Sequence, residues 1–279
     1  MTNVLTITWL TFHEAWRRRM VQVALVLGVA FVLLYGGGLA LIVQEIRTDP
    51  EFANSEVALR FGYNLLAMAG FYVVHFLTVM LAIFSSVDTI SGEIASHTIQ
   101  TIVTKPIRRW QVLSGKWLGY ALMIALYLAM LTGGILLALY LVTGYLPPNP
   151  LQGVLLLLLE ALVLVSLSLL GGTHFSTLTN GVLLFMFYGI TFIGSYVEQF
   201  GSLLQSEAAV RVGIVTSLLL PVEVMWRRIA YVMQPGFLRQ TPSPFMSATA
   251  PSTAMIAYAA IYAAVALALA IRSFNRREL

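Results

Sequence analysis

Long apolar runs separated by short polar segments dominate this sequence. A helix needs about 20 apolar residues to cross the hydrocarbon core of a bilayer, and six runs are close to or above that length. The runs are continuous rather than alternating, so they lack the pattern of a membrane β-barrel. We therefore predict an all-α polytopic membrane protein, one domain over residues 1–279, with six transmembrane helices. The predicted spans are about 20–43, 63–87, 116–143, 151–175, 182–200 and 252–271.

The composition excludes an ordinary water-soluble domain. Hydrophobic residues make up 59% of the chain and charged residues only 10%, whereas soluble domains carry about 25% charge. Too few charges are present to cover a solvated surface. The chain has no cysteine, which excludes disulfides and thiolate metal sites.

The first 19 residues are mixed in character and end in three arginines. Apolar and aromatic residues within them share a helical face, which favours an amphipathic interfacial helix. The alternative is that they are the basic start of the first span. The residues on that face are Val4, Leu5, Thr8, Trp9, Phe12 and Trp16.

Orientation follows from the basic residues, which concentrate on the cytoplasmic side of membrane proteins. With both termini inside, ten of the sixteen Lys and Arg residues fall in cytoplasmic segments. We therefore predict a multi-pass protein of the cytoplasmic (inner) membrane with both termini cytoplasmic.

Residues 201–251 lie between the fifth and sixth spans and do not contain a full span. Val212–Leu220 is apolar but too short, and Pro221 is suited to open a second helix. We predict external re-entrant or interfacial gate helices and a loop. In the second helix, one face is predicted to carry Met225, Ile229, Val232 and Met233, and the polar face Arg227, Arg228 and Tyr231.

The polar stretch 88–115, between the second and third spans, is the main candidate for function. Isoleucines are spaced so that a helix over about residues 89–103 shows one apolar face. Pro106 ends that helix, because the residue before proline is pushed out of helical geometry. Arg109 and then Lys116 lead into the third span.

This stretch resembles the signature of ABC-2-type transporter permeases. The resemblance rests on Asp88, Ser91-Gly92-Glu93, Thr98-Ile99, Lys105-Pro106, Arg109 and Ser114-Gly115-Lys116. Within that superfamily it is most similar to permeases of multi-copper enzyme maturation, the group of the nitrous-oxide-reductase maturation permease.

The resemblance implies a permease that pairs with a second permease, identical in the simplest case, and with two copies of a separate ABC ATP-binding subunit. The stretch would be a cytoplasmic coupling helix seated on that subunit, and the helices around Pro221 would close the outer gate. An extracytoplasmic accessory protein is a further possible partner, and no nucleic acid is expected. The coupling residues so implied are Asp88, Gly92, Glu93, Thr98, Ile102, Lys105, Pro106 and Arg109.

The chain contains no phosphate-binding loop of the G-x-x-x-x-G-K-[ST] type. Gly115-Lys116 is followed by Trp117, and Trp110 stands where the first glycine is needed. We expect no ATP hydrolysis by this chain, no catalytic residue and no cofactor of its own; ATP and Mg²⁺ would belong to the partner subunit.

Ionisable groups inside the spans are costly and so are candidate functional residues. Glu160 lies among leucines in the fourth span; the alternative is a carboxylate near the interface or hydrogen-bonded between helices. Tyr188 and Phe192 in the aromatic fifth span are candidate pathway residues. His75 and the scattered methionines show no metal-ligand spacing, so no metal site is predicted.

Three functions remain open from the sequence. The leading one is a permease subunit that moves an unidentified substrate with ATP hydrolysed elsewhere. The second is a membrane mechanotransmitter or scaffold that relays ATPase motion without moving a solute. The third, an ion-coupled carrier, ranks last because it needs several intramembrane charges and the chain shows no internal repeat.

Overall fold

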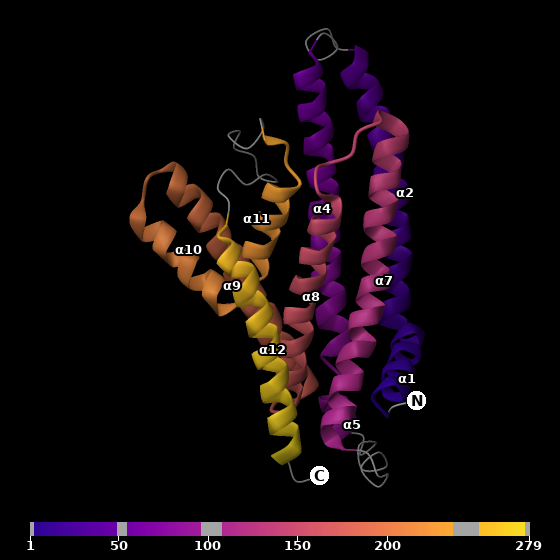
Figure 1. Ribbon diagram of the computed structural model, residues 1–279, viewed down its shortest axis with the longest axis vertical. Helices are drawn as coiled ribbons and strands as arrows, with labels where there is room; N and C mark the ends of the chain where they lie inside the picture. The colour runs from indigo at the N-terminus through magenta and orange to yellow at the C-terminus, as the bar shows by residue number, and fades with distance from the viewer. Residues whose placement is uncertain (1–2, 49–54, 96–107, 237–250, 277–279) are drawn as a thin grey trace.

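The computed structural model describes residues 3–48, 55–95, 108–236 and 251–276. Within these ranges nearly every residue is helical and no strand occurs (Figure 1). The described helices are α1 (Asn3–Arg17), α2 (Arg19–Thr48), α4 (Glu56–Ser86), α5 (Ser91–Ala95), α7 (Arg109–Thr143), α8 (Pro150–Gly172), α9 (Thr177–Leu203), α10 (Glu207–Leu219), α11 (Val222–Val232) and α12 (Thr253–Arg276).

Six of the described helices are long and apolar enough to cross a membrane: α2, α4 continued by α5, α7, α8, α9 and α12. They correspond to the six apolar runs, and the predicted fold class is confirmed. The bent pair of α10 and α11 would count as a seventh span only if its two halves crossed as one.

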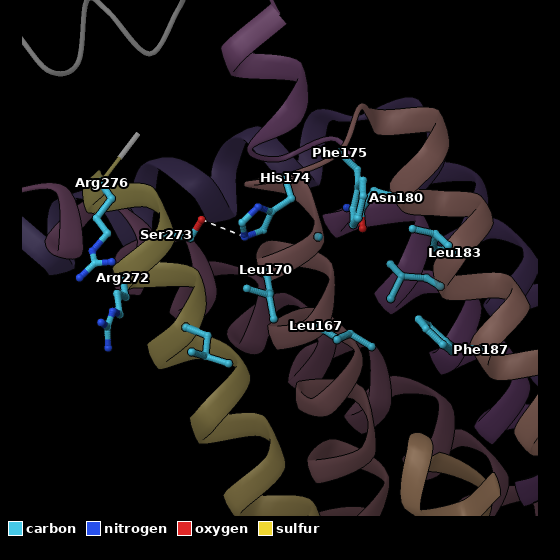
Figure 2. Close-up of a pocket in the computed structure, with 13 residues that line it drawn as sticks. Leu167, Leu170, His174, Phe175, Asn180, Leu183, Phe187, Arg272, Ser273 and Arg276 are labelled. Atoms are coloured by element: carbon cyan, nitrogen blue, oxygen red, sulfur yellow. Dashed lines mark hydrogen bonds between the residues drawn. The ribbon is translucent and has the colours of Figure 1, made fainter. Parts of the chain in front are cut away.

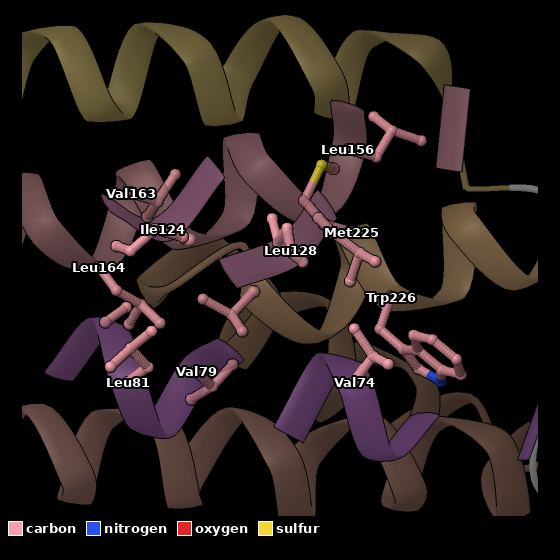
Figure 3. Packing of buried hydrophobic residues seen from close by; sticks show 14 of the residues in the cluster. Val74, Val79, Leu81, Ile124, Leu128, Leu156, Val163, Leu164, Met225 and Trp226 are labelled. Atoms are coloured by element: carbon pink, nitrogen blue, oxygen red, sulfur yellow. The ribbon is translucent and has the colours of Figure 1, made fainter. Parts of the chain in front are cut away.

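The core of the bundle lies where α4, α7, α8 and α11 meet (Figure 3). Their buried side chains interdigitate, and α2, α9 and α12 lie outside them with many exposed leucines, such as Leu34 at 75%. Apolar surface of this extent suits a lipid environment rather than water. The labelled core residues are Val74, Val79, Leu81, Ile124, Leu128, Leu156, Val163, Leu164, Met225 and Trp226.

The two ends of the bundle differ. Both marked termini lie at the end that carries α5 (Figure 1), called here the α5 end. At the opposite or far end, α7 stops at Gly144, whose φ of +71° is in the left-handed region that favours glycine. Pro150 then opens α8 at its first position, where a missing N–H costs nothing.

α10 and α11 enter the bundle from the far end and return to it. α10 follows the far end of α9, and the two helices of the pair are bent by 105°. α11 ends beside the start of α8, where Asn149 Nδ2 donates to the Val232 carbonyl at 3.5 Å. Asn64 Nδ2 donates to the next carbonyl, that of Met233, at 3.2 Å. The pair is therefore a hairpin rather than a straight seventh crossing.

The bend of this hairpin leaves carbonyls at the end of α10 without helical partners. Two tyrosines of α12 satisfy them: Tyr258 Oη donates to Leu218 O at 2.6 Å and Tyr262 Oη to Leu219 O at 3.0 Å. Tyr262 is nine residues into α12, about 14 Å at 1.5 Å per residue. A break in a helix is tolerated at such depth when neighbouring side chains satisfy the backbone.

α1 is a separate helix that packs along the start of α7. A Cβ on Gly115 would lie 2.7 Å from Ile7 Cβ, and one on Gly119 would lie 2.7 Å from Thr11 Cβ. The two glycines, four residues apart, let the helix backbones approach closely. Trp9 and Trp16 remain exposed on another face of α1, which suits a membrane interface.

Candidate functional site

Asp88 directly follows the C-cap of α4 and connects three elements at the α5 end. Thr177 Oγ1, at the start of α9, donates to Asp88 Oδ1 at 3.0 Å. Arg18 Nη1, between α1 and α2, lies 3.7 Å from Asp88 Oδ2. Burial disfavours the charged form of Arg18, but neighbouring charges that include Glu14 and Asp88 outweigh it and raise the pKa of Arg18. The guanidinium therefore stays charged beside Asp88.

Glu93 of α5 points back into the protein rather than outward. Its carboxylate pairs with Lys116 of α7, whose side chain is only 6% exposed. Lys116 Nζ also donates to the Thr89 carbonyl at 3.4 Å, and Thr89 Oγ1 donates to Tyr120 Oη at 2.7 Å. A buried ammonium needs such partners, so Glu93 and Lys116 fix α5 to α7.

Gly92 has a steric role in this arrangement. A Cβ at that position would lie 2.1 Å from Asp88 Oδ1, so a larger residue there would displace the Asp88 carboxylate. Asp88, Gly92 and Glu93, with their partners Arg18, Lys116 and Thr177, are called the coupling knot below.

Arg109 lies apart from the coupling knot, in the first turn of α7. Its Nη1 donates to the carbonyls of Phe274 at 3.3 Å and Asn275 at 3.4 Å, near the end of α12. Basic groups at a helix C-terminus are favourable to its dipole. The other predicted coupling residues lie outside the described residues: Thr98, Ile102, Lys105 and Pro106.

A second group of charged side chains lies deep inside the bundle. His75 of α4 lies between Glu160 of α8 and Glu223 of α11: Nδ1 is 2.8 Å from Glu160 Oε1, and Nε2 is 3.4 Å from Glu223 Oε1. All three side chains are at most 4% exposed. Glu160 is ten residues into α8, about 15 Å, which is half the thickness of a bilayer core. These residues form the charge cluster.

Aromatic rings surround the charge cluster. The ring centroids of Tyr72 and Trp226 lie 5.9 and 5.2 Å from that of His75. The ring centroid of Tyr188 is 6.5 Å from that of His75. The structure thus brings together Glu160 and Tyr188, two predicted pathway residues.

Phe192, the third predicted pathway residue, lies one turn beyond Tyr188 on α9. Its ring centroid is 6.2 Å from that of Tyr188 and 5.1 Å from that of Tyr196. Tyr196 Oη in turn lies 3.3 Å from Tyr72 Oη. The aromatic face of α9 therefore extends from the charge cluster toward the far end.

Arg227, on the predicted polar face of α11, is buried against α9. The residue is only 6% exposed, and its guanidinium pairs with Glu198 of α9 through two contacts, Nη1 to Oε1 at 2.7 Å and Nη2 to Oε2 at 2.9 Å. A bidentate pair satisfies a buried charge well. α11 is therefore packed on both faces, because α9 supplies an acid at the position of the arginine.

The chemistry of the charge cluster follows from its geometry. Neutral imidazole has one N–H and one lone pair, so His75 attracts both carboxylates only when both nitrogens carry protons. Its two nitrogens face different acids, and the described residues contain no group of three or more acidic or histidine side chains that could hold a metal ion. The cluster therefore brings three helices together, and the strength of that link depends on which of its groups carry protons.

Sequence reasoning missed Glu223 and gave His75 too little weight. Glu223 falls within the predicted external gate helices, where the sequence assigns it no role, and Glu160 is the acid that the sequence marks inside a span. An acid between Val222 and Val224 in an otherwise apolar stretch was the available signal. Its partner lies 148 residues away along the chain (223 − 75), and no sequence pattern could indicate that pairing.

Comparison with known proteins identifies the family. Residues 5–279 match the family described as ABC-2 family transporter protein. No curated protein matches the chain at a significant level. The match covers nearly the whole chain and includes the coupling knot, the charge cluster and all six candidate spans. The chain therefore belongs to the ABC-2 family of transporter proteins, multi-pass membrane components that are not themselves catalytic and work with an ATP-binding subunit.

Proposed function

We propose that this chain is the permease subunit that moves a still unidentified substrate across the cytoplasmic membrane, with ATP hydrolysed by a separate subunit. Two such subunits, with their ATP and Mg²⁺, would drive two permeases, identical in the simplest case, whose termini face the cytoplasm. The similarity to copper-enzyme maturation permeases makes an extracytoplasmic accessory protein a further candidate partner.

One observation carries this proposal: α4 connects the coupling knot to the hairpin of α10 and α11. Asp88 follows the end of α4, and His75, thirteen residues earlier, contacts Glu223 of the hairpin. Thirteen residues of helix span about 20 Å. A displacement of the coupling knot would therefore reach the hairpin through one continuous rigid element.

The hairpin suits the role of an outer gate. It is bent in the middle, it lies between α8, α9 and α12, and its described end returns to the far end of the bundle. Its attachments to its neighbours include charged contacts from Glu223 and Arg227. Contacts of this kind break as units rather than stretch gradually, which favours two discrete gate positions.

The alternative function is a mechanotransmitter that relays ATPase motion to an extracytoplasmic partner without moving a solute. The complete burial of the charge cluster favours it, because the middle of the bundle is filled by side chains. The two functions differ in flux: a transmitter would couple ATP hydrolysis to the partner without net movement of any solute into reconstituted vesicles.

The proposal is tested by co-purification with the ATP-binding subunit. Asp88 is about half exposed at the α5 end, so Asp88→Lys should weaken a stoichiometric complex. Glu56→Lys is the matched control: it makes the same charge change at the opposite end of α4, where the Glu56 side chain is 78% exposed. Thr177→Val removes an internal partner of Asp88 and leaves the surface charge unchanged.

We expect Asp88→Lys alone to lose most of the bound ATP-binding subunit. If Thr177→Val loses as much, Asp88 acts within the chain and is not itself a contact residue. A wild-type chain that binds no ATP-binding subunit would contradict the proposed function.

A further inference from the structure

A groove opens at the α5 end between α9 and α12, with α8 as its floor (Figure 2). Its volume is about 680 Å³, within the range of about 300–1,000 Å³ typical of ligand sites. It is separate from the charge cluster, because Glu160 lies seven residues nearer the start of α8 than Leu167, the first residue of that helix in the groove lining. None of its side chains takes part in the proposed gate.

The groove is apolar inside and basic at its mouth. Leu167 and Leu170 of α8 and Leu183 and Phe187 of α9 line it, as Figure 2 shows. Two exposed arginines of the last turns of α12, Arg272 and Arg276, lie at one side.

Within the described residues, no carboxylate lies within ion-pair distance of either arginine of the mouth. The ion pairs of this end of the bundle are made by Arg18 and Lys116, on other elements. Ser273 Oγ and His174 Nε2, 3.0 Å apart, add polar groups at the same level. Among the described residues, the mouth is therefore a cationic site above an apolar slot, and none of their carboxylates neutralises it.

We propose that this groove binds one anionic phospholipid, with an acyl chain between α9 and α12 and the phosphate at Arg272 and Arg276. Basic pockets between membrane helices on one side of a bilayer recognise anionic head groups in this way. A second copy of the chain is a poorer occupant, because a two-fold interface uses the same face of both copies and would gather four arginines in one interface. The proposal does not depend on the proposed function.

The test is native mass spectrometry of the purified full-length chain in detergent. The chain is offered equal amounts of phosphatidylglycerol and phosphatidylcholine with identical acyl chains. We expect one retained phosphatidylglycerol per chain and a clear preference over phosphatidylcholine. Arg272→Gln with Arg276→Gln should reduce that preference roughly tenfold or more, at about 1 kcal/mol per basic residue.

Two further variants test whether lipid binding depends on these two arginines rather than on net charge, and whether the apolar groove itself holds the lipid. Arg17→Gln with Arg19→Gln removes the same charge at the same end of the bundle, outside the groove, and should keep the preference. Leu269→Trp fills the groove from α12, where Leu269 is 47% exposed, and should reduce retention of both lipids.

Three results would overturn the proposal. One is a wild-type chain that shows no preference between the two lipids. Another is a preference that persists when Arg272 and Arg276 are replaced, or that falls equally when Arg17 and Arg19 are replaced. The third is a lipid-free dimer that Leu269→Trp dissociates, which would make the groove an interface between two copies. No ATP-binding subunit is used, so the result is independent of the test of the proposed function.

Discussion

At the scale of single residues, His75 determines how three helices are held together. It is the only described side chain that contacts both Glu160 and Glu223 as an ion-pair partner. Replacing one member of a buried charged group leaves the others unpaired in a medium of low dielectric constant, and the cost of that is about 3–5 kcal/mol.

His75→Gln should therefore lower the free energy of unfolding in detergent by about 3–5 kcal/mol. Adding Glu160→Gln removes one of the stranded carboxylates, so the double variant should lose less than the sum of the two single variants. Thr78→Ser is the control: it is buried one turn away on α4 and keeps its hydroxyl. Denaturant unfolding followed by tryptophan fluorescence gives the free energy of unfolding of the two single variants, the double variant and the control. Strictly additive losses would show that His75 and Glu160 are not coupled.

Glu160 could be predicted as a candidate because one charge in a run of leucines is visible in the sequence. Its partners could not, since His75 and Glu223 reach it from distant segments. The same limit applies to Glu93: the resemblance implies a contact to the ATP-binding subunit, and nothing in the sequence indicates the pair that Glu93 makes with Lys116 inside the chain.

At the scale of elements, the close contact of α1 with α7 depends on two glycines. Gly115→Ala would place a Cβ 2.7 Å from Ile7 Cβ, so α1 should move away from α7. We expect faster hydrogen exchange and proteolysis within residues 3–17.

Gly133→Ala is the matched control for that substitution. It lies in the same helix with no atom within 4 Å of an added Cβ, and should be neutral or stabilising by up to about 1 kcal/mol. Equal exchange in α1 for both variants would contradict the close packing.

The hairpin should depend on the two tyrosines of α12 that satisfy the end of α10. Tyr258→Phe with Tyr262→Phe leaves the carbonyls of Leu218 and Leu219 without donors, at a cost of about 1–3 kcal/mol each. We expect faster hydrogen exchange at the bend, residues 218–223. Tyr140→Phe is the control, because the side chain of that exposed tyrosine makes no hydrogen bond to any described residue. Unchanged exchange in the double variant would show that other contacts hold the bend.

Elements differed in how far the sequence predicted them. The apolar runs indicated all six long helices, because length and apolar content decide that class. A helix is expected over residues 89–103. The structure describes residues 89–95 of this stretch, and Ser91–Ala95 of them are helical. The Gly115-x-x-x-Gly119 spacing is a readable sign of close helix packing. The sequence favours an interfacial helix or the start of the first span for residues 1–19, and neither interpretation indicates that α1 packs on α7.

At the scale of the whole molecule, α4 is the element that joins the two candidate sites. The coupling knot at its α5 end is held to α1, α7 and α9, and the charge cluster at its middle is held to α8 and α11. We therefore propose that His75 is a positioning residue for the hairpin, and that its loss disconnects the proposed gate from the ATP-binding subunit without preventing assembly.

The most direct test uses the absence of cysteine in the chain. Leu220→Cys places one thiol at the fully buried bend of the hairpin. Its labelling rate by a membrane-permeant maleimide is measured in vesicles that contain the ATP-binding subunit, with and without ATP. We predict an ATP-dependent rate that persists with Thr78→Ser and disappears with His75→Gln, while ATP hydrolysis shows that each complex is assembled. The same ATP dependence in the His75→Gln protein, or none in the Leu220→Cys protein itself, would contradict the claim that α4 drives the hairpin.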